Sequence, residues 1–415
     1  MLAAVQHKTK ILGVLSIAQL AAMLIWYNFS AVLPILKQEW RMSNDQAGTL
    51  LAVFQLGYVI AVLFTGWLTD RIGGKLTFVI SAIETGLASL GFVFFADDFT
   101  SGMVWRTLAG LGQAGLYVPG MQILSRWYGT SERGRAIGIY TCSLVGAYAG
   151  AYYIAAPLAA MYSWRQALLW TSIWAFPAAL LVYLCIPAEK GEGLPASPTQ
   201  QEDASGPKRA AALIMGRAAW LIIAGYMGHM WELYTLWGWI GAFMTHVLTL
   251  KGIDAATAIS YGGALAATCI LMGGFSPGLA GVASDRYGRC LTAVVALVIS
   301  GLCALFFGWL VTAPVWLVIL VGLVYGFFIV ADSAIFKAGL TELVPAGSLG
   351  LALGLQSVFG FGVTIVSPKL FGMVLDSYGW GWAFAMLGIG PVIGTVCMLA
   401  LRQLPEAKAM AGGKR

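Results

Sequence analysis

The chain has 415 residues, of which 59% are hydrophobic and only 10% are charged. A soluble globular protein has about 25% charged residues and too little interior to hide so much apolar surface. A bilayer acts as solvent for such a sequence, so the composition predicts a polytopic membrane protein. The net charge of +6 does not indicate a nucleic-acid partner, because the basic residues are dispersed over short loops, as orientation in a membrane requires.

The apolar runs fall into two groups of six along the chain. Since a spanning helix needs about 20 apolar residues, the first group is predicted at 11–36, 46–69, 75–95, 101–124, 136–160 and 164–187. The second group is predicted at 218–246, 256–281, 290–311, 313–338, 349–375 and 379–402. Pro, Gly, Ser and charged residues between the groups indicate a flexible polar linker. We therefore expect two domains, at 1–187 and 218–402. A cytoplasmic linker is expected between them at 188–217, and a tail at 403–415.

The distribution of basic residues predicts the orientation in the membrane. The first apolar run follows basic residues like a secretory signal, but it continues to Leu36 without a convincing cleavage site, so we expect an uncleaved first span. With both termini inside, 17 of the 24 Lys and Arg residues fall on the cytoplasmic side and five fall outside, while Arg106 and Lys337 lie within spans. Cytoplasmic loops carry such an excess, so both termini are predicted to be cytoplasmic.

The two groups of spans share a repeated loop motif. The motif after the second span recurs after the eighth span at an offset of 215 residues, as Gly66, Asp70, Arg71 and Gly73 against Gly281, Asp285, Arg286 and Gly288. A Tyr-x-Trp triplet recurs at an offset of 216, at Tyr162 to Trp164 and at Tyr378 to Trp380. The shared register indicates a duplicated six-helix unit in parallel orientation.

The repeated loop resembles the G-x-x-x-D-[RK]-x-G-x-[RK] signature of the major facilitator superfamily. A second resemblance lies in the fourth span, where Arg106-Thr-Leu-Ala-Gly110-Leu-Gly112-Gln113-Ala114 is similar to the R-x-x-x-G-x-G-x-A pattern of that family. The resemblance extends over essentially the whole chain. It implies an all-α membrane protein of about 12 transmembrane helices, arranged as two pseudo-symmetric six-helix bundles that rock around a central site.

The repeated loops are candidates for a conformational latch. Their glycines allow tight turns, and an aspartate can accept from the free N–H groups at a neighbouring helix start. An arginine can close a salt bridge that exists in only one conformation. The alternative is a solvated turn that merely obeys the positive-inside rule. The candidate latch residues are Gly66, Asp70, Arg71, Gly73, Lys75, Gly281, Asp285, Arg286, Gly288 and Arg289.

The few charges inside the spans are the leading site candidates. Arginine keeps its proton and is costly near the bilayer interior, so Arg106 is predicted to face a polar cavity or a partner. The alternative is that Arg106 snorkels to the nearby end of its span. Within the family, the resemblance implies proton coupling or substrate contact at this position. Gly110 and Gly112 on the following turns permit close approach of a neighbouring helix.

The seventh and tenth spans carry titratable groups. His229 and Glu232 are three residues apart and share a helix face, so they can hydrogen-bond each other or a common ligand. Such a pair suits a proton relay, and the alternative is a satisfied structural pair. Asp332 is a further candidate because its span is the counterpart of the fourth, whereas Lys337 is expected to snorkel. Two interpretations of Glu84 stay open, as a buried partner of a neighbour or as a protonated acid.

Aromatic and amide side chains are predicted to line the same pocket. The candidates are Trp26, Asn28, Gln113, Tyr117, Trp237 and Tyr325. Most aromatic residues in spans serve packing or interfacial anchoring, so only about half of such residues are expected to reach the cavity. The six cysteines stand singly and are expected to be small core residues and not disulfides or metal ligands.

Together these features predict a secondary transporter of a small organic solute with proton coupling. The expected solute is an organic anion held by Arg106, with His229, Glu232 and Asp332 exchanging the proton. The alternatives are proton-driven efflux of an amphipathic or cationic compound and a non-transporting membrane receptor or assembly protein. No ATP-binding, hydrolase or metal-ligand motif is present, so we expect no enzyme activity and no cofactor. We expect a monomer in a bacterial inner membrane, with the solute and lipid as its partners.

Overall fold

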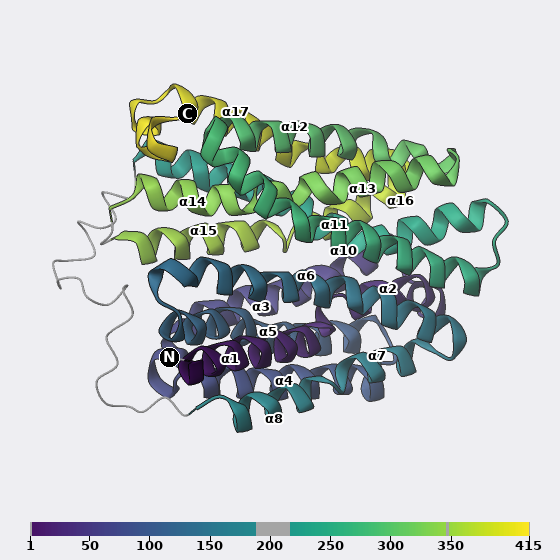
Figure 1. Ribbon diagram of the computed structural model, residues 1–415. Coiled ribbons are helices and arrows are strands. Elements are labelled where there is room, and N and C mark those ends of the chain that lie inside the picture. The colour runs from purple at the N-terminus through teal and green to yellow at the C-terminus, as the bar shows by residue number, and fades with distance from the viewer. Residues whose placement is uncertain (1, 188–215, 346–347, 415) are drawn as a thin grey trace. The chain divides into compact units, whose positions relative to one another are not determined.

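The computed structural model describes the whole chain except for residues 1, 188–215, 346–347 and 415 (Figure 1). Most of the expected linker therefore lies outside the described residues. The described residues form helices and turns without a β-strand. The chain is an all-α protein, as the long apolar runs predict, because only a helix satisfies all its backbone hydrogen bonds within one membrane segment.

The first six expected spans are all helical, and two of them are interrupted. The helices are α1 (Leu2–Met23), α2 (Ile25–Glu39), α3 (Asn44–Ile72), α4 (Gly74–Phe95), α5 (Phe99–Trp127), α6 (Thr130–Met161), α7 (Trp164–Ser172) and α8 (Ala175–Cys185). Thus α1 and α2 share the first span and meet at Leu24, while α7 and α8 share the sixth.

The second six spans contain α10 (Arg217–Leu250), α11 (Ala255–Tyr287), α12 (Arg289–Phe307), η1 (Gly308–Thr312), α13 (Val315–Ala331), α14 (Ser333–Leu343), α15 (Leu349–Val363), α16 (Ser367–Leu387), α17 (Ile389–Gln403) and η3 (Pro405–Gly413). The division expected between the last two spans at 376–378 lies next to a break in α16 at Gly379. Gly379 is non-helical, with a φ of 80° that suits glycine, and it joins the two helical segments of α16. A further break, which the sequence did not predict, separates α15 from α16 within the eleventh expected span.

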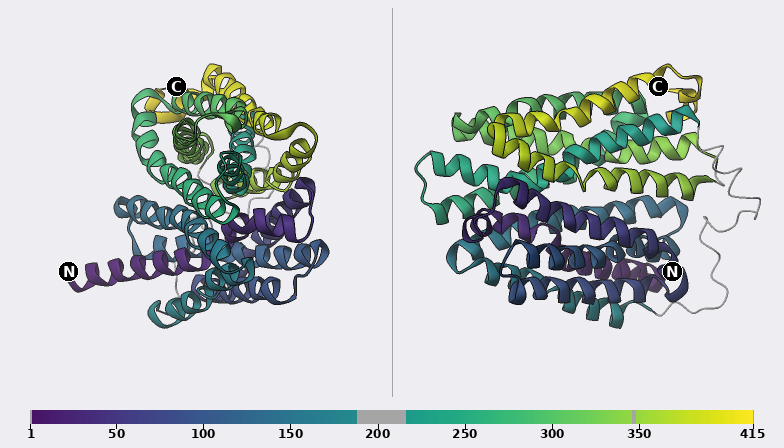
Figure 2. Two further views of the ribbon diagram at one scale, coloured as in Figure 1. Left: turned by 90° about the vertical axis from the view of Figure 1, so that its right-hand side faces the viewer. Right: turned by 180° about the vertical axis from the view of Figure 1, so that it is seen from behind.

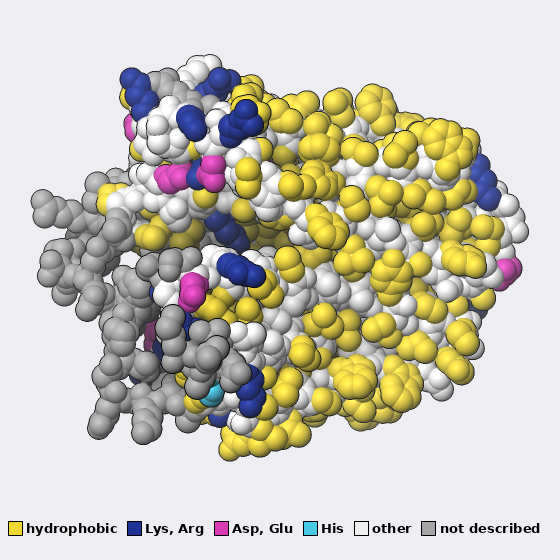
Figure 3. Space-filling view, viewed as in Figure 1, with side chains coloured by type: hydrophobic (Ala, Val, Ile, Leu, Met, Phe, Trp, Pro, Cys, Tyr) yellow, Lys and Arg dark blue, Asp and Glu magenta, His cyan; other side chains and the backbone are white. Residues whose placement is uncertain are grey.

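The composition of most helices suits a bilayer. Among the described residues, nine helical stretches are long and apolar enough to cross a membrane, and the stretch Leu349–Gln403 includes two of the expected spans. The expected spans in α5 and α10 fall outside these nine, and they carry the buried polar residues Arg106, His229 and Glu232. Hydrophobic side chains cover the flanks of the helices in Figure 3, where Lys and Arg gather toward the helix ends.

The described chain forms two compact units, and the helices of each run side by side (Figure 2). Among the described residues, the first unit contains 2–187, 237–271 and 368–376, and the second contains 216–236, 272–345, 348–367 and 377–414. The later part of α10 and the early part of α11 therefore belong to the first unit, although they come from the second half of the sequence.

Glycines bring α5 against its neighbours in the first unit. A Cβ atom on Gly57 of α3 would lie 2.1 Å from the Thr107 carbonyl oxygen, and one on Gly110 would lie 2.1 Å from that of Phe54. Real Cβ atoms do not approach so closely, so only glycine permits this spacing of α3 and α5. The close approach expected from Gly110 therefore exists and positions the start of α5, including Arg106.

A second close contact joins the start of α3 to the segment of α16 before Gly379, in the same unit. The Asp376 carboxylate accepts from the backbone N–H of Asn44 at 3.0 Å, from its side-chain Nδ2 at 2.7 Å and from the N–H of Asp45 at 2.9 Å. Cβ atoms on Gly48 and Gly372 would lie 2.3 Å and 2.1 Å from backbone oxygens of the facing helix. We call this set the α3–α16 contact.

Candidate functional site

Arg106 lies on the third turn of α5 and is only 4% exposed. Its guanidinium carbon lies 4.2 Å from the ring centre of Phe54 and 4.6 Å from that of Phe29. No described carboxylate forms an ion pair with it, and its Nε has no hydrogen-bond partner in the described chain. The two rings stabilise the cation in part, but a buried charge without an anion is costly.

A small cavity adjoins Arg106. It has a volume of about 10 Å³ and is lined by polar Asn28 and Ser89 together with Trp105 and Phe92. Asn28 donates through Nδ2 to Thr171 Oγ at 2.9 Å, which orients its amide group. The volume is roughly that of one water molecule. The Arg106 side chain thus lines a small cavity with polar residues in its wall and is buried within the protein.

The amide and hydroxyl candidates on α5 are engaged in packing. Gln113 is fully buried and donates through Nε2 to the Ala22 carbonyl oxygen and to Thr85 Oγ1, both at 3.2 Å. Tyr117 stacks on Tyr140, and its hydroxyl lies 2.9 Å from Thr141 Oγ1. Neither residue lines the cavity next to Arg106.

Trp26 and Trp237 belong to an aromatic cluster in the first unit. Trp26 packs edge-on against Phe54, the same ring that contacts Arg106, with centroids 5.2 Å apart. Trp237 packs against Tyr148 at 5.5 Å, and its carbonyl oxygen accepts from the Tyr152 hydroxyl at 2.6 Å. The predicted aromatic lining is thus a cluster of mutually packed rings, and Trp26 packs against the Phe54 ring that also contacts Arg106.

In the second unit, His229 pairs with Asp332 and not with Glu232. His229 Nδ1 lies 2.8 Å from Asp332 Oδ1, and its Nε2 lies 2.8 Å from the hydroxyl of Ser333. Both partners are positioned by a helix break, since α13 ends at Ala331 and α14 begins at Ser333. Both ring nitrogens of His229 thus lie within 2.8 Å of a polar group, Nδ1 beside the Asp332 carboxylate and Nε2 beside the Ser333 hydroxyl.

Glu232 lies one turn along α10 and is also buried. Its Oε2 accepts from the Ser300 hydroxyl of α12 at 3.1 Å, while Oε1 has no hydrogen-bond partner among the described residues. The Tyr325 hydroxyl from α13 lies close to the same carboxyl group. The Asp332 carboxylate also interacts electrostatically with Glu232. The structure thus brings His229, Glu232, Asp332 and Tyr325 into one buried polar cluster, while Arg106 lies in the first unit.

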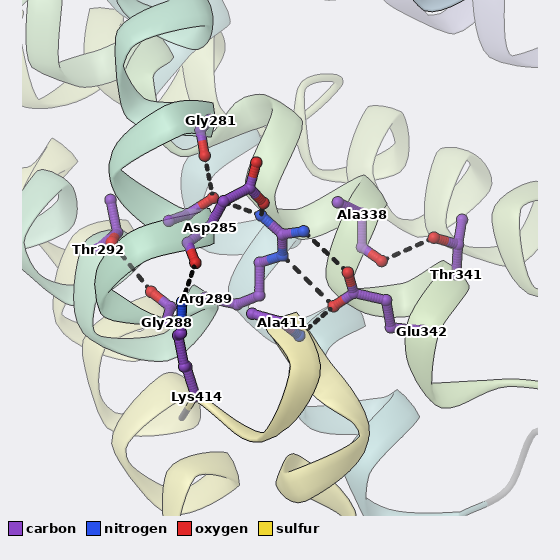
Figure 4. A network of polar contacts seen from close by, with 11 residues as sticks. Gly281, Asp285, Gly288, Arg289, Thr292, Ala338, Thr341, Glu342, Ala411 and Lys414 are labelled. Carbon is purple, nitrogen blue, oxygen red and sulfur yellow. Dashed lines mark hydrogen bonds and ion pairs between the residues drawn. The ribbon is translucent and has the colours of Figure 1, made fainter. Parts of the chain in front are cut away.

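The second copy of the loop motif forms a network of charges (Figure 4). Arg289 lies between Asp285, at 2.5 Å, and Glu342 of α14, at 2.8 Å. Glu342 also accepts from the backbone N–H of Ala411, and Lys414 donates to the Asp285 carbonyl oxygen. The ion pair thus uses Arg289, whereas Arg286 lies 5.3 Å from the ring of Tyr287. The network ties the loop to α14 and to the C-terminal η3.

The first copy of the motif has a similar backbone but other side-chain contacts. Gly73 and Gly288 occupy equivalent turns with φ values of 83° and 97°, which favour glycine. Arg71 lies 4.5 Å from the ring of Trp67, and Lys75 lies 5.0 Å from that of Tyr183. At Gly66 and Gly281 the structure leaves open space for a side chain. The two copies therefore share the turn, and their latch role stays a prediction.

Several residues of these clusters were missed from the sequence. Phe29 and Phe54 hold Arg106 but look like any apolar span residue. Ser333 and Ser300 are common span residues as well. One signal was available for Ser300, because an offset of 216 makes it the repeat counterpart of Glu84.

Of the cysteines, Cys303 lies near Glu232 and Tyr325 in the buried cluster of the second unit. All six cysteines are free, and Cys142 is exposed, so the expectation of core cysteines is wrong at that position. The described residues contain no group of three His, Cys, Asp or Glu side chains able to hold a metal ion.

Comparisons with known proteins agree with this architecture. The model of the Major Facilitator Superfamily matches residues 15–277 and 260–414. A hexuronate transporter of Bacillus subtilis (strain 168) is 24% identical, with 86% of each chain covered. A gentisate transporter of Corynebacterium glutamicum is also 24% identical and covers 91% of this chain and 84% of its own. The solved structure of a nucleoside transporter is similar with a TM-score of 0.74 at 14% identity, over 96% of this chain and 99% of that chain.

Proposed function

The chain belongs to the major facilitator superfamily and is a membrane transporter, and we propose that it carries a small organic anion by proton-coupled alternating access. The observation that carries the proposal is Arg106, a buried cation without a described carboxylate partner. A carboxylate solute would supply the missing counter-charge through charge-assisted hydrogen bonds. Relatives named for transport of hexuronate, gentisate and cis,cis-muconate support this class of solute.

The cavity beside Arg106 is too small for a whole solute. Its volume of about 10 Å³ suits one water molecule, which the anionic group would displace as the site widens during the transport cycle. Asn28 and Ser89 in the cavity wall would offer hydrogen bonds to the solute oxygens. Alternating access by rocking of two bundles supplies the wider conformation.

The buried cluster of the second unit supports proton coupling. His229 and Asp332 form a pair that can share one proton, and Glu232 with Ser300 offers a second carboxyl nearby. Titratable groups buried in a membrane are costly and typically mark proton relays. We propose that protonation of this cluster accompanies movement of the anion. We further propose that the protein lies in a bacterial inner membrane with both termini in the cytoplasm, as the basic residues predict.

The anion proposal is tested by binding and transport with the purified protein. Galacturonate, gentisate and cis,cis-muconate are each added in a thermal-unfolding assay, since a ligand of the native state raises the melting temperature with its concentration. Uptake into proteoliposomes is then measured for Arg106→Ala and for the exposed control Arg135→Ala. The proposal expects at least one acid to raise the melting temperature. Arg106→Ala should abolish this rise, and Arg135→Ala should keep it. Equal uptake by Arg106→Ala and wild type refutes it.

Proton coupling is tested separately with Asp332→Asn and Glu232→Gln, which keep size and remove titration. An imposed pH gradient should drive accumulation of the identified acid in wild type only. Counterflow exchange of labelled acid without a gradient should persist in the variants, which shows that they fold and bind. Gradient-driven accumulation by both variants would rule these groups out as the coupling site.

A further inference from the structure

An apolar groove on the surface of the first unit contains a carboxyl group. The groove lies between α4 and α5, has a volume of about 650 Å³, and is lined by Ile80, Ile83, Leu87, Phe94, Trp105 and Leu108 around Glu84. Its rim is strongly exposed, with Leu87 at 58% and Phe94 at 60%. In a membrane protein such a surface faces the hydrocarbon of the bilayer.

Glu84 has no partner within the described protein. Its Oε2 is buried without a hydrogen bond and lies against Gly112, where a Cβ atom would come within 1.8 Å of it. Gly112 thus leaves the space that the carboxyl group occupies. The lining contains no basic residue. Of the two interpretations left open by the sequence, a buried partner of a neighbouring group finds no support among the described residues.

The depth of Glu84 restricts what can meet it. Glu84 follows Gly74 by 10 residues and precedes Phe95 by 11 in α4, so it lies about 15 Å from either end of the helix. That is the middle of a hydrocarbon layer about 30 Å thick. A phospholipid headgroup stays at the interface. The occupant must therefore dissolve in the membrane and carry a polar group into its centre.

The chemistry of the carboxyl group narrows the occupant further. An ionised carboxylate at this depth is costly, and the groove offers no cation to offset it, so the neutral acid suits the site. A neutral carboxylic acid has an O–H donor that needs an acceptor. We propose that the groove between α4 and α5 binds a membrane-dissolved lipophile with an apolar body and a carbonyl or imine acceptor that hydrogen-bonds Glu84.

Trp105 connects the groove to the cavity beside Arg106. Its ring lines both spaces, stacks on Phe95 at 5.9 Å and occupies the room left by Gly91, where a Cβ atom would lie 2.2 Å from it. An occupant of the groove would press on this ring. The groove is thereby distinct from the Arg106 cavity and shares one wall with it.

A lipophilic carbodiimide tests the site because it is such a lipophile and also reacts with it. The Glu84 proton moves to one carbodiimide nitrogen while the carboxyl oxygen bonds the central carbon, which forms an O-acylisourea. Transfer of the acyl group to the other nitrogen gives a stable N-acylurea. Nothing leaves, so the peptide gains the mass of one reagent molecule.

The protein in lipid nanodiscs is treated with dicyclohexylcarbodiimide, and adducts are located by peptide mass spectrometry. We expect an adduct at Glu84 that excess dicyclohexylurea, an unreactive carbonyl lipophile, suppresses. Leu87→Trp, which fills the groove from an exposed position, should lose the adduct. The matched control Leu76→Trp, an exposed leucine on α4 outside the groove, should keep it.

Three results would overturn the proposal. Absence of an adduct at Glu84 in wild type shows that the lipophile does not reach the carboxyl group. Equal labelling by a water-soluble carbodiimide shows that Glu84 meets water and not the bilayer. Labelling unaffected by dicyclohexylurea, with Leu87→Trp labelled like wild type, shows that hydrocarbon chains cover the groove without a specific occupant.

Discussion

Removal of the Asp376 carboxylate should release the start of α3. In the α3–α16 contact this carboxylate accepts from the backbone N–H groups of Asn44 and Asp45, two of the donors that a helix start leaves without an internal partner. It therefore acts as a helix cap supplied from another helix. Asp376→Ala removes the acceptor and its charge together, so the two amides lose their partners.

The expected size follows from the two effects that the carboxylate combines. A cap is worth about 1 kcal/mol, and a negative charge at a helix start adds about 0.3–1 kcal/mol when exposed. Asp376 is exposed, so we take the total as about 1–2 kcal/mol, which corresponds to roughly 5- to 30-fold in a local opening equilibrium. Asp376→Asn keeps an oxygen acceptor without the charge and should show a smaller effect.

Amide hydrogen exchange measures this opening directly, because the amides of Asn44 and Asp45 exchange only when their hydrogen bonds break. Asp376→Ala should speed exchange in the peptide that contains these two residues by the stated factor. The control is Ser43→Ala, which removes the hydroxyl that caps the Gln46 amide without touching α16. Unchanged exchange of the Asn44 and Asp45 amides in Asp376→Ala would refute the capping argument.

Three further outcomes follow from the packing. Gly110→Ala places a Cβ atom against the Phe54 carbonyl oxygen and should destabilise the protein by about 1–3 kcal/mol through overpacking. A lower midpoint of thermal unfolding would show this loss. The control Gly138→Ala enters open space and should leave the midpoint no lower. Glu342→Gln should weaken the Arg289 pair and speed limited proteolysis of η3 relative to Glu406→Gln. Asp98 caps α5, and the hydrogen bonds that its carboxylate accepts from Ser101 lower its pKa. The stability that this carboxylate gives the protein should therefore fade as pH falls through that pKa. Asp98→Ala should remove this part of the pH dependence of thermal unfolding.

The helical spans could be predicted from sequence because a bilayer imposes one simple demand, an apolar helix of fixed length. Interruptions such as the break at Asp332 could not, since they depend on packing between helices. Nothing in the hydropathy around Asp332 marks the change from α13 to α14. Conversely, the Tyr-Gly-Trp turn at residues 378–380 could be predicted, because it interrupts an apolar run and Gly379 supplies the positive φ that separates the two helical segments of α16.

The candidate site could be predicted in its members but not in its pairing. Arg106, His229, Glu232 and Asp332 stand out because charge inside a span is rare and costly. Helix spacing favours a His229–Glu232 pair, yet the closer partner of His229 is Asp332, 103 residues later in the chain. Asp376 was missed altogether, since an exposed acid at the end of a span resembles any solvated residue until the fold places it at a distant helix start.

The C-terminal η3 has a practical consequence for work with this protein. Ala407 and Met410 are fully buried against the second unit, and Lys414, the penultimate residue, donates to the loop of Asp285. An affinity tag fused directly after residue 415 would start two residues beyond that contact and would pull on the Arg289–Glu342 network. A purification handle is better separated from it by a cleavable spacer, because otherwise thermal-shift and transport measurements would report on a strained tail as well as on the transporter.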